Sequence, residues 1–275
     1  MDYVIDLQNI TYRREKNELL TDINWQVRPG EHWAILGLNG SGKTTMLNIV
    51  NGYIWPTSGK VSVLGHPYGT VDLRELRMSI GWVSLSLQEK LYATDKVEQI
   101  VVSGKYATIG LYEKPGEEDW ERANALMEQM RCIHLKGRQY QTCSQGEKQK
   151  ILIARALMSS PKLLILDEPC NGLDLFSREA LLEVIDQLAK SPDAPTLLYV
   201  THHTEEILPM FRHALLLRRG EVFASGQVSE VLTEQHLSSF FESPVEVLRR
   251  EDRYWVLPKQ QRRDPAAQEA LMTRE

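Results

Sequence analysis

The sequence has few cysteines, no excess of basic charge and no long apolar run. Its three cysteines, Cys132, Cys143 and Cys170, form no Cys-x-x-Cys pair, so neither a disulfide framework nor a zinc ribbon is indicated. The formal net charge of −5 argues against general binding to nucleic acids. No stretch approaches the roughly 18 apolar residues of a membrane span, and the first residues lack the basic and apolar regions of a leader peptide. We therefore expect a protein of the reducing cytoplasm, large enough at 275 residues for one core or one domain with an insertion.

Glycine is concentrated at one point, where an apolar strand pattern gives way to a helix pattern. The apolar stretch 33–36 is followed by Gly-Leu-Asn-Gly-Ser-Gly-Lys-Thr-Thr at 37–45 and then by a largely apolar stretch at 46–50. Glycines allow main-chain N–H groups to curve around an anion, and the helix that follows directs its unpaired N–H groups at the same point. This spacing predicts a phosphate-binding loop for a nucleoside triphosphate. The predicted contacts come from Gly37, Asn39, Gly40, Ser41, Gly42, Lys43, Thr44 and Thr45.

Two side chains of this loop have separate predicted roles. Lys43 is placed to reach the β- and γ-phosphates with its positive charge. The Thr44 hydroxyl suits Mg²⁺, which prefers oxygen ligands. A chance glycine-rich turn is the alternative, but strand, loop and helix occur in the order that phosphate binding needs. The loop alone leaves kinases, GTPases and ATPases open.

A second group of polar residues follows a buried-strand pattern. The apolar run 163–166 is followed by Asp167 and Glu168. A strand of an open α/β sheet delivers such residues to the carboxyl edge, where ligands bind, and neighbouring side chains point to opposite sides. We expect Asp167 to hold the Mg²⁺ shell and Glu168 to polarise the water that attacks the γ-phosphate. Considered without the phosphate loop, the same residues could form an exposed acidic turn.

The rest of the chain alternates between strand and helix patterns. Between 115 and 158 the period is helical, with Trp120, Ala123, Met127 and Met130 on one face, which favours core packing over a ligand site. We expect a helical subdomain inserted among the strands. Strands are predicted at 3–12, 19–27, 59–65, 163–167, 196–201 and 214–217.

A third motif resembles a known family. The segment 143–150, Cys-Ser-Gln-Gly-Glu-Lys-Gln-Lys, resembles the signature sequence of ATP-binding-cassette (ABC) ATPases, whose usual form is Leu-Ser-Gly-Gly-Gln. Kinases and GTPases lack this segment. From the residues alone, Ser144 and Glu147 form a capping box at a helix start. A capped helix start is itself an anion site, so the two interpretations are compatible.

The resemblance implies a nucleotide site shared by two subunits. ATP would lie between the phosphate loop of one subunit and Ser144, Gly146 and Glu147 of the other, in a head-to-tail homodimer. Asp174, in the run Asn-Gly-Leu-Asp at 171–174, resembles the loop that passes between the two sites of such a dimer.

Two further residues match family positions. Tyr12 stands where the family's aromatic residue stacks on adenine, although a tyrosine in a strand is otherwise more often a packing residue. His202 resembles the switch histidine that contacts the γ-phosphate. The spacing of His202, His203 and His213 fits no common zinc pattern. The motifs occur in the family's order over about residues 3–235.

One position departs from the family pattern. After the strand pattern at 80–84 the family has a glutamine that touches Mg²⁺ and the attacking water, and here that position is Leu85. Gln88 lies three residues further on. One possibility is that the loop is remodelled and the Gln88 amide takes over this catalytic role. The other is that the step which couples the ATP site to a membrane partner differs from that of the family.

These observations predict an α/β fold of the P-loop NTPase (RecA-like) type, with an N-terminal antiparallel β subdomain and a helical subdomain inserted at about 86–158. The ATPase domain would cover 1–235, and 236–275 would be an extension with a mobile polar tail.

The resemblance implies an ATPase that uses ATP and Mg²⁺ and acts on a separate polytopic membrane subunit at the cytoplasmic face of the inner membrane. The region 97–111 is similar to ATPases of metal-chelate and molybdate-related importers. The alternative is a soluble ABC ATPase of a cytosolic machine for repair or cluster assembly.

Overall fold

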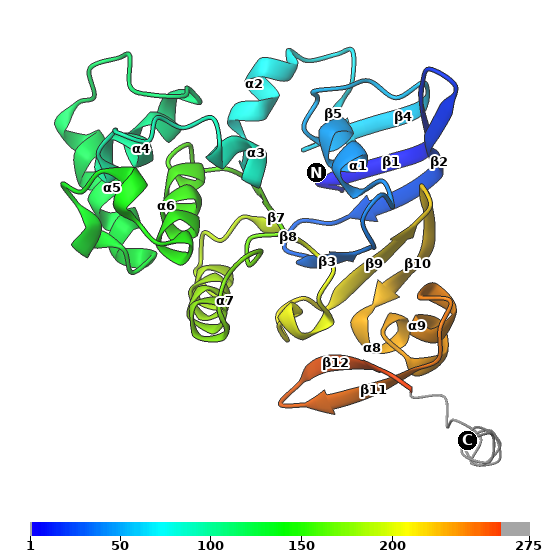
Figure 1. Cartoon of the computed structure of the whole chain (residues 1–275). Coiled ribbons are helices and arrows are strands. Elements are labelled where there is room, and N and C mark those ends of the chain that lie inside the picture. The colour runs from blue at the N-terminus through cyan, green and yellow to red at the C-terminus, as the bar shows by residue number, and fades with distance from the viewer. Residues whose placement is uncertain (1, 260–275) are drawn as a thin grey trace, which may run out of the picture.

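A six-stranded, mostly parallel sheet forms the centre of the fold (Figure 1). The structure is a computed structural model that describes residues 2–259. The strand order is β10-β9-β3-β8-β7-β6, with β10 antiparallel to β9 and the other neighbours parallel. The strands are β3 (Trp33–Leu36), β6 (Ile80–Val83), β7 (Leu163–Asp167), β8 (Thr196–Thr201), β9 (His213–Arg218) and β10 (Glu221–Gln227). Strand β7 is apolar until its last residue because alternate side chains enter two different buried clusters, as Leu164 and Ile165 do.

A second, antiparallel sheet covers one face of this centre. Its strand order is β2-β1-β4-β5. Helix α1 (Lys43–Val50) contributes Met46 to the same buried cluster as Ile5 of this sheet and Ile35 of the central sheet. The carboxyl end of β3 is thereby fixed next to the N-terminus of α1. The strands are β1 (Ile5–Arg14), β2 (Asn17–Val27), β4 (Ser58–Val63) and β5 (His66–Pro67).

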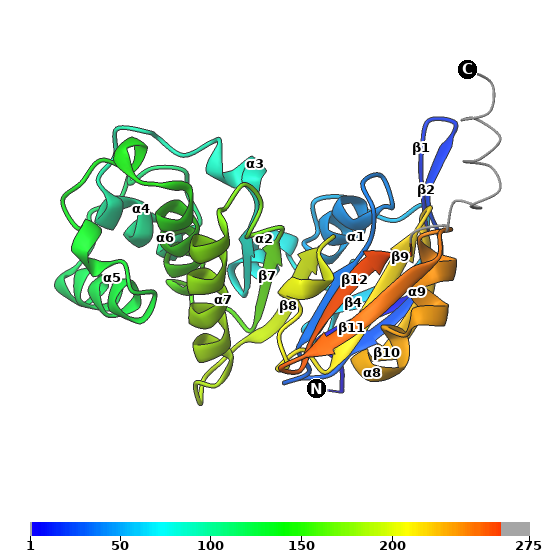
Figure 2. The ribbon, with the colours of Figure 1, turned by 60° about the horizontal axis from the view of Figure 1, so that its bottom comes forward.

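Helices gather at one end of the molecule and lie between β6 and β7 in the chain (Figures 1 and 2). Ala123, Met127 and Met130 are fully buried and Trp120 is partly buried, so the predicted stripe is core packing. The turn that follows α4 approaches α6 so closely that a Cβ at Gly104 would collide with the carbonyl of Arg155. The segments between β6 and β7 are α3 (Leu85–Gln88), α4 (Val97–Ser103), α5 (Glu117–Gln129), α6 (Gln145–Leu157) and the 3₁₀ turns η1 (Gly104–Tyr106), η2 (Ile133–Leu135) and η3 (Tyr140–Thr142). Helix α2 (Leu73–Met78) precedes β6 in the chain.

The remaining elements follow β7 and end in a hairpin at the opposite end of the molecule (Figure 2). In that hairpin, Arg253 donates from Nη1 to Glu179 of α7 at 2.6 Å and from Nε to the carbonyl of Glu205 at 2.7 Å. The hairpin is therefore fastened to the segment that follows β8. These elements are α7 (Leu175–Ala189), η4 (Thr204–Glu206), α8 (Val228–Val231), α9 (Glu234–Phe240), β11 (Val245–Arg250) and β12 (Arg253–Pro258).

The predicted α/β class, with its antiparallel N-terminal sheet and inserted helices, is confirmed. The expected division after residue 235 falls inside α9. Leu237 and Phe240 of this helix belong to the same buried cluster as the central sheet, so the extension shares the main core. Most of the expected mobile tail, residues 260–275, lies outside the described residues. Within residues 2–259, no helix has both the length and the hydrophobicity needed to cross a bilayer.

Candidate active site

A cavity of about 840 Å³ opens where loops from both sheets meet. The phosphate-binding loop, the carboxyl ends of β6 and β7, the start of β2 and the β9–β10 turn form its walls. Ligands of open α/β sheets bind at the carboxyl ends of the parallel strands. The cavity is lined by Glu18, Leu19, residues 39–45, Trp82, Ser84, Leu85, Ser86, Glu89, Asp167, Glu168, Asn171, Arg219 and Gly220.

The glycine-rich loop takes a shape that other residues would resist. Gly40 and Gly42 have φ values of 79° and 104°, in the left-handed region. A Cβ at Gly37 would lie 2.5 Å from Ser41 Oγ and 2.8 Å from the carbonyl oxygen of Leu217. Helix α1 begins after Gly42 without a side-chain cap, so its first N–H groups are available to an anion. Ser41 Oγ is buried and has no hydrogen-bond partner among the described residues, which suits a site that a polar ligand completes.

Lys43 supplies the cationic group of this site. Its side chain is buried, and Nζ donates to the carbonyl oxygens of Gly37 at 2.6 Å and Leu38 at 3.3 Å. Nζ also lies 3.7 Å from Glu168 Oε1. Burial lowers the pKa of Lys43, and the charges of Glu168 and Asp167 oppose that shift. A buried ammonium held by carbonyls and carboxylates is positioned to exchange these partners for phosphate oxygens.

Two adjacent carboxylates enter the cavity from the end of β7. Burial, with the nearby Glu168 charge as the next cause, raises the pKa of Asp167 to about 6. Glu168 has a φ of 51°, which is unusual for a residue with a side chain, and its N–H donates to the carbonyl of Val200 at 2.9 Å. His202 Nδ1 lies 3.4 Å from Glu168 Oε1, an ion-pair distance without hydrogen-bond geometry. The structure thus places Glu168 beside both Lys43 and His202. Lys43, Asp167 and Glu168 line the cavity, whereas His202 does not line it.

The oxygen donors at this site fit a hard cation such as Mg²⁺. Thr44 and Asp167 both line the cavity. A carboxyl group with a raised pKa ionises more readily when a cation is near, because the positive charge offsets the cost of burial. Among residues 2–259, no group of three or more His, Cys, Asp and Glu side chains is arranged to hold a metal ion. Phosphate oxygens and water would have to complete the Mg²⁺ shell, as is usual for Mg²⁺ sites.

The signature residues lie outside this cavity. Ser144 caps α6 by accepting from Glu147 N–H at 3.3 Å, and Glu147 accepts from Ser144 N–H at 2.7 Å, which confirms the capping box. A Cβ at Gly146 would lie 3.4 Å from Ser177 Cβ, so the start of α6 lies beside the start of α7. Asp174 caps α7 by accepting from the N–H groups of Phe176 and Ser177. These residues form a second polar group, separate from the phosphate loop.

Gln88 does not lie at the position that the sequence suggested for it. Ser84 caps the single turn of α3, and Leu85, Ser86 and Glu89 of this region line the cavity, whereas Gln88 does not. The Gln88 amide instead exchanges two hydrogen bonds of 3.0 Å with Gln145. The structure therefore gives no support to a catalytic role for Gln88, because its polar atoms are engaged with α6.

Tyr12 is likewise absent from the cavity lining; it is half-buried in β1, where it pairs with Leu20 of β2. Sequence reasoning missed Glu18, Arg219 and Gly220, which do line the cavity. Gly220 N–H donates to the carbonyl of Ser41 at 2.9 Å. Arg219 and Gly220 form the turn between β9 and β10, and a local turn pattern gives no information on a contact with the phosphate loop.

Comparison with known proteins gives one consistent result. The family model described as ABC transporter matches residues 20–171. YlmA of Bacillus subtilis (strain 168), an uncharacterized ABC transporter ATP-binding protein, is 52% identical over 251 residues, 91% of this chain and 95% of YlmA. The molybdate import ATP-binding protein MolC of Haemophilus influenzae is 30% identical over 246 residues, 89% of this chain and 90% of MolC. The dimeric structure of the ABC transporter cassette MJ0796 is similar with a TM-score of 0.69 and 26% identity, over 82% of this chain and 98% of that cassette.

Proposed function

This chain belongs to the ABC transporter family as an ATP-binding, ATP-hydrolysing component, and on that premise we propose that its hydrolysis of MgATP drives transport through a separate membrane subunit. The observation that carries the proposal is the cavity in which Lys43, Thr44, Asp167 and Glu168 converge beside the Ser41 hydroxyl, which has no partner within residues 2–259. The names of the relatives favour a transporter over a cytosolic repair or assembly machine. The molybdate import role in the name of MolC supports a place among metal-chelate or oxyanion importers.

The residues of the cavity have distinct proposed roles in hydrolysis. The loop N–H groups, the start of α1 and Lys43 bind the phosphates and orient them. Thr44 and Asp167 would hold Mg²⁺, which would supply positive charge beside the phosphate oxygens. Glu168 orients and polarises the attacking water, and His202, 3.4 Å from Glu168, contacts the γ-phosphate. Lys43 and Thr44 begin α1, and Asp167 and Glu168 stand at the carboxyl end of β7, so the proposed roles draw on two neighbouring elements.

The second polar group supports a paired arrangement. Ser144, Gly146 and Asp174 lie outside the cavity of their own chain, yet the capped start of α6 offers N–H groups suited to an anion. A head-to-tail homodimer would bring this group to the phosphate loop of the partner subunit and complete two equal sites. The dimeric form of the related MJ0796 cassette supports this arrangement. The pair would act as a peripheral complex at the cytoplasmic face of the inner membrane, bound to a polytopic subunit.

The substitution Glu168→Gln tests the proposal. It keeps the size of the side chain and removes its basicity, so hydrolysis should fall by roughly 100-fold or more, while ATP still binds and a stable dimer accumulates. Steady-state phosphate release and the molar mass in solution, with and without MgATP, measure both effects. Glu183→Gln on α7, where the carboxylate pairs with Arg131 at 2.9 Å, is the matched control and should keep wild-type turnover. Normal turnover by Glu168→Gln would refute the proposed base, and a monomer at saturating MgATP would count against the pair.

A further inference from the structure

A carboxylate is buried directly behind the segment that carries His202. Glu206 ends the turn η4 and is 3% exposed. Its Oε2 accepts from Thr201 Oγ1 at 2.6 Å and from the Tyr199 hydroxyl at 3.0 Å, both on β8. A buried carboxylate is costly unless hydrogen bonds replace its water. Both hydroxyls donate to the same carboxylate oxygen of Glu206. An apolar side chain at position 206 could not accept these hydrogen bonds.

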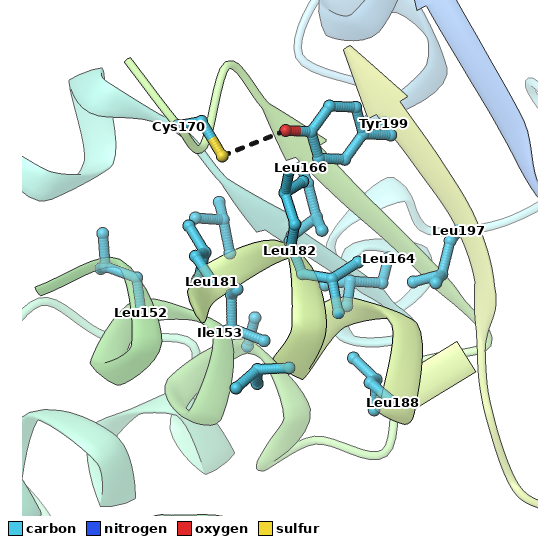
Figure 3. Close-up of a cluster of buried hydrophobic side chains, with 14 of the residues drawn as sticks. Leu152, Ile153, Leu164, Leu166, Cys170, Leu181, Leu182, Leu188, Leu197 and Tyr199 are labelled. Carbon is cyan, nitrogen blue, oxygen red and sulfur yellow. Dashed lines mark hydrogen bonds between the residues drawn. The ribbon is translucent and has the colours of Figure 1, made fainter. Parts of the chain in front are cut away.

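The Tyr199 hydroxyl connects this carboxylate to the loop that follows Glu168. It lies 3.3 Å from Cys170 Sγ, and Figure 3 shows the two groups pointing toward each other above Leu166 and Leu182. Complete burial, together with the neighbouring Cys170 and Glu206, raises the pKa of Tyr199 well above its usual value. The hydroxyl therefore keeps its proton and remains a donor. Cys170 follows Glu168 by two residues, so the contact restrains the catalytic loop.

Thr201 connects the same carboxylate to the histidine segment. Its Oγ1 donates to Glu206 and accepts from the backbone N–H of His203 at 3.0 Å. These bonds fix the backbone on both sides of His202. The Glu168 backbone, with its φ of 51°, lies in the left-handed region, which a residue with a side chain adopts only where its surroundings hold it. Both partners of the 3.4 Å contact between His202 and Glu168 are thus held by one buried network.

We propose that Glu206 is a positioning residue for ATP hydrolysis, which sets the His202 ring against Glu168 through Thr201 and restrains the Glu168 loop through Tyr199 and Cys170. This inference rests on the proposed function, because it explains how His202 and Glu168 are aligned for the roles proposed for them there. Glu206 itself does not line the cavity. Its removal should disturb the reacting geometry and leave the phosphate loop unchanged.

The test is Glu206→Gln, which keeps the shape of the side chain and loses its charge. Because a small misplacement of a reacting group has a large effect on rate, kcat should fall at least roughly tenfold. The KM for ATP should stay within about twofold, since Lys43 and the loop N–H groups bind the phosphates. In the nucleotide-free protein, the imidazole proton resonance of His202, assigned by its loss in His202→Ala, should shift. Glu183→Gln, which removes one negative charge on α7, should alter neither kcat nor the resonance.

If Glu206→Gln does not fold, Tyr199→Phe serves as a second variant. It removes one donor of the same network and should give smaller changes in the same direction.

Two results would overturn the inference. One is a kcat within twofold of the wild type at unchanged KM. The other is a lower kcat with an unmoved His202 resonance, because the effect would then not pass through the histidine. Glu168→Gln measured in the same series separates this failure from failure of the proposed function. If Glu168→Gln abolishes hydrolysis and Glu206→Gln is silent, only the positioning role is lost.

Discussion

At the scale of single residues, Asp167 and Glu168 illustrate how adjacent carboxylates acquire different environments. Asp167 is the last residue of β7, and burial raises its pKa to about 6. Glu168 leaves the strand with a positive φ and points its carboxylate toward Lys43 and His202. Their order in the chain predicts two carboxylates at one edge of the sheet. The separate environments follow from the turn at Glu168, which the sequence pattern does not indicate.

Asp167 should make the stability of the nucleotide-free protein depend on pH. Its folded-state pKa of about 6 exceeds the ordinary value of 3.8, so between these values the folded state binds more protons than the unfolded state. Stability should therefore fall as pH rises through this window, by at most about 3 kcal/mol. Asp167→Asn removes this dependence and should be more stable than the wild type at pH 7, yet lose hydrolysis because Mg²⁺ loses a carboxylate ligand.

Thermal unfolding at pH 4.5 and pH 7 measures this effect. Asp186→Asn is the control, because its carboxylate pairs with Lys190 on the surface of α7 and should leave the pH slope unchanged. If Asp167→Asn and the wild type lose the same stability between pH 4.5 and pH 7, ionisation of Asp167 is not the cause of the pH dependence.

At the scale of elements, the strands that the sequence predicts best are those that are buried on both faces. β7 and β8 occupy 163–167 and 196–201 as expected, because unbroken apolar runs of this length fit central parallel strands. The start of α6 was equally predictable, since Ser144 and Glu147 lie three residues apart. The C-terminal hairpin was not predicted. Its attachment to the core depends on Arg253 reaching Glu179, 74 residues away, and local patterns contain no such contact.

The role of α3 was also beyond local reasoning, because the partners of Gln88 lie 57 and 61 residues further on. Gln88 joins α3 to α6 through Gln145 and Gln149. We expect Gln88→Ala to lower stability by about 1–3 kcal/mol, since it leaves partly buried amides without partners. Turnover should stay within about twofold of the wild type, because the amide does not line the cavity.

A double-mutant cycle with Gln145→Ala checks this assignment. The single variants should cost similar stability, and the double variant should cost clearly less than their sum. Thermal unfolding and steady-state ATPase rates are the measurements. A tenfold loss of kcat in Gln88→Ala, with normal kcat in Gln145→Ala, would instead show that Gln88 reaches the attacking water and replaces the glutamine missing at Leu85.

At the scale of the whole molecule, the chain holds two separate polar groups, which in the proposed dimer would be the two halves of a site. The phosphate loop and the carboxylates face one cavity, and the capped starts of α6 and α7 lie outside it. Sequence motifs name both halves but contain no information on their separation. That separation depends on the packing of α6 and α7 against the central sheet, a property of the complete fold. A closed pair of chains with twofold symmetry would complete both sites at once.

Mixing two inactive variants should therefore restore activity. Lys43→Ala removes the positive charge that would bind the phosphates in one half of the site. Ser144→Asp places a negative charge in the other half. It keeps the helix cap, because Asp caps a helix as well as Ser does. Each variant alone should hydrolyse ATP at less than about 1% of the wild-type rate. In an equal mixture about half of the dimers pair unlike chains, and each of these holds one intact site, so about a quarter of wild-type activity should return. Ser144→Asn, a neutral cap, is the control and should stay active by itself. Different affinity tags establish that mixed dimers form, and mixed dimers as inactive as their parents would contradict the head-to-tail arrangement.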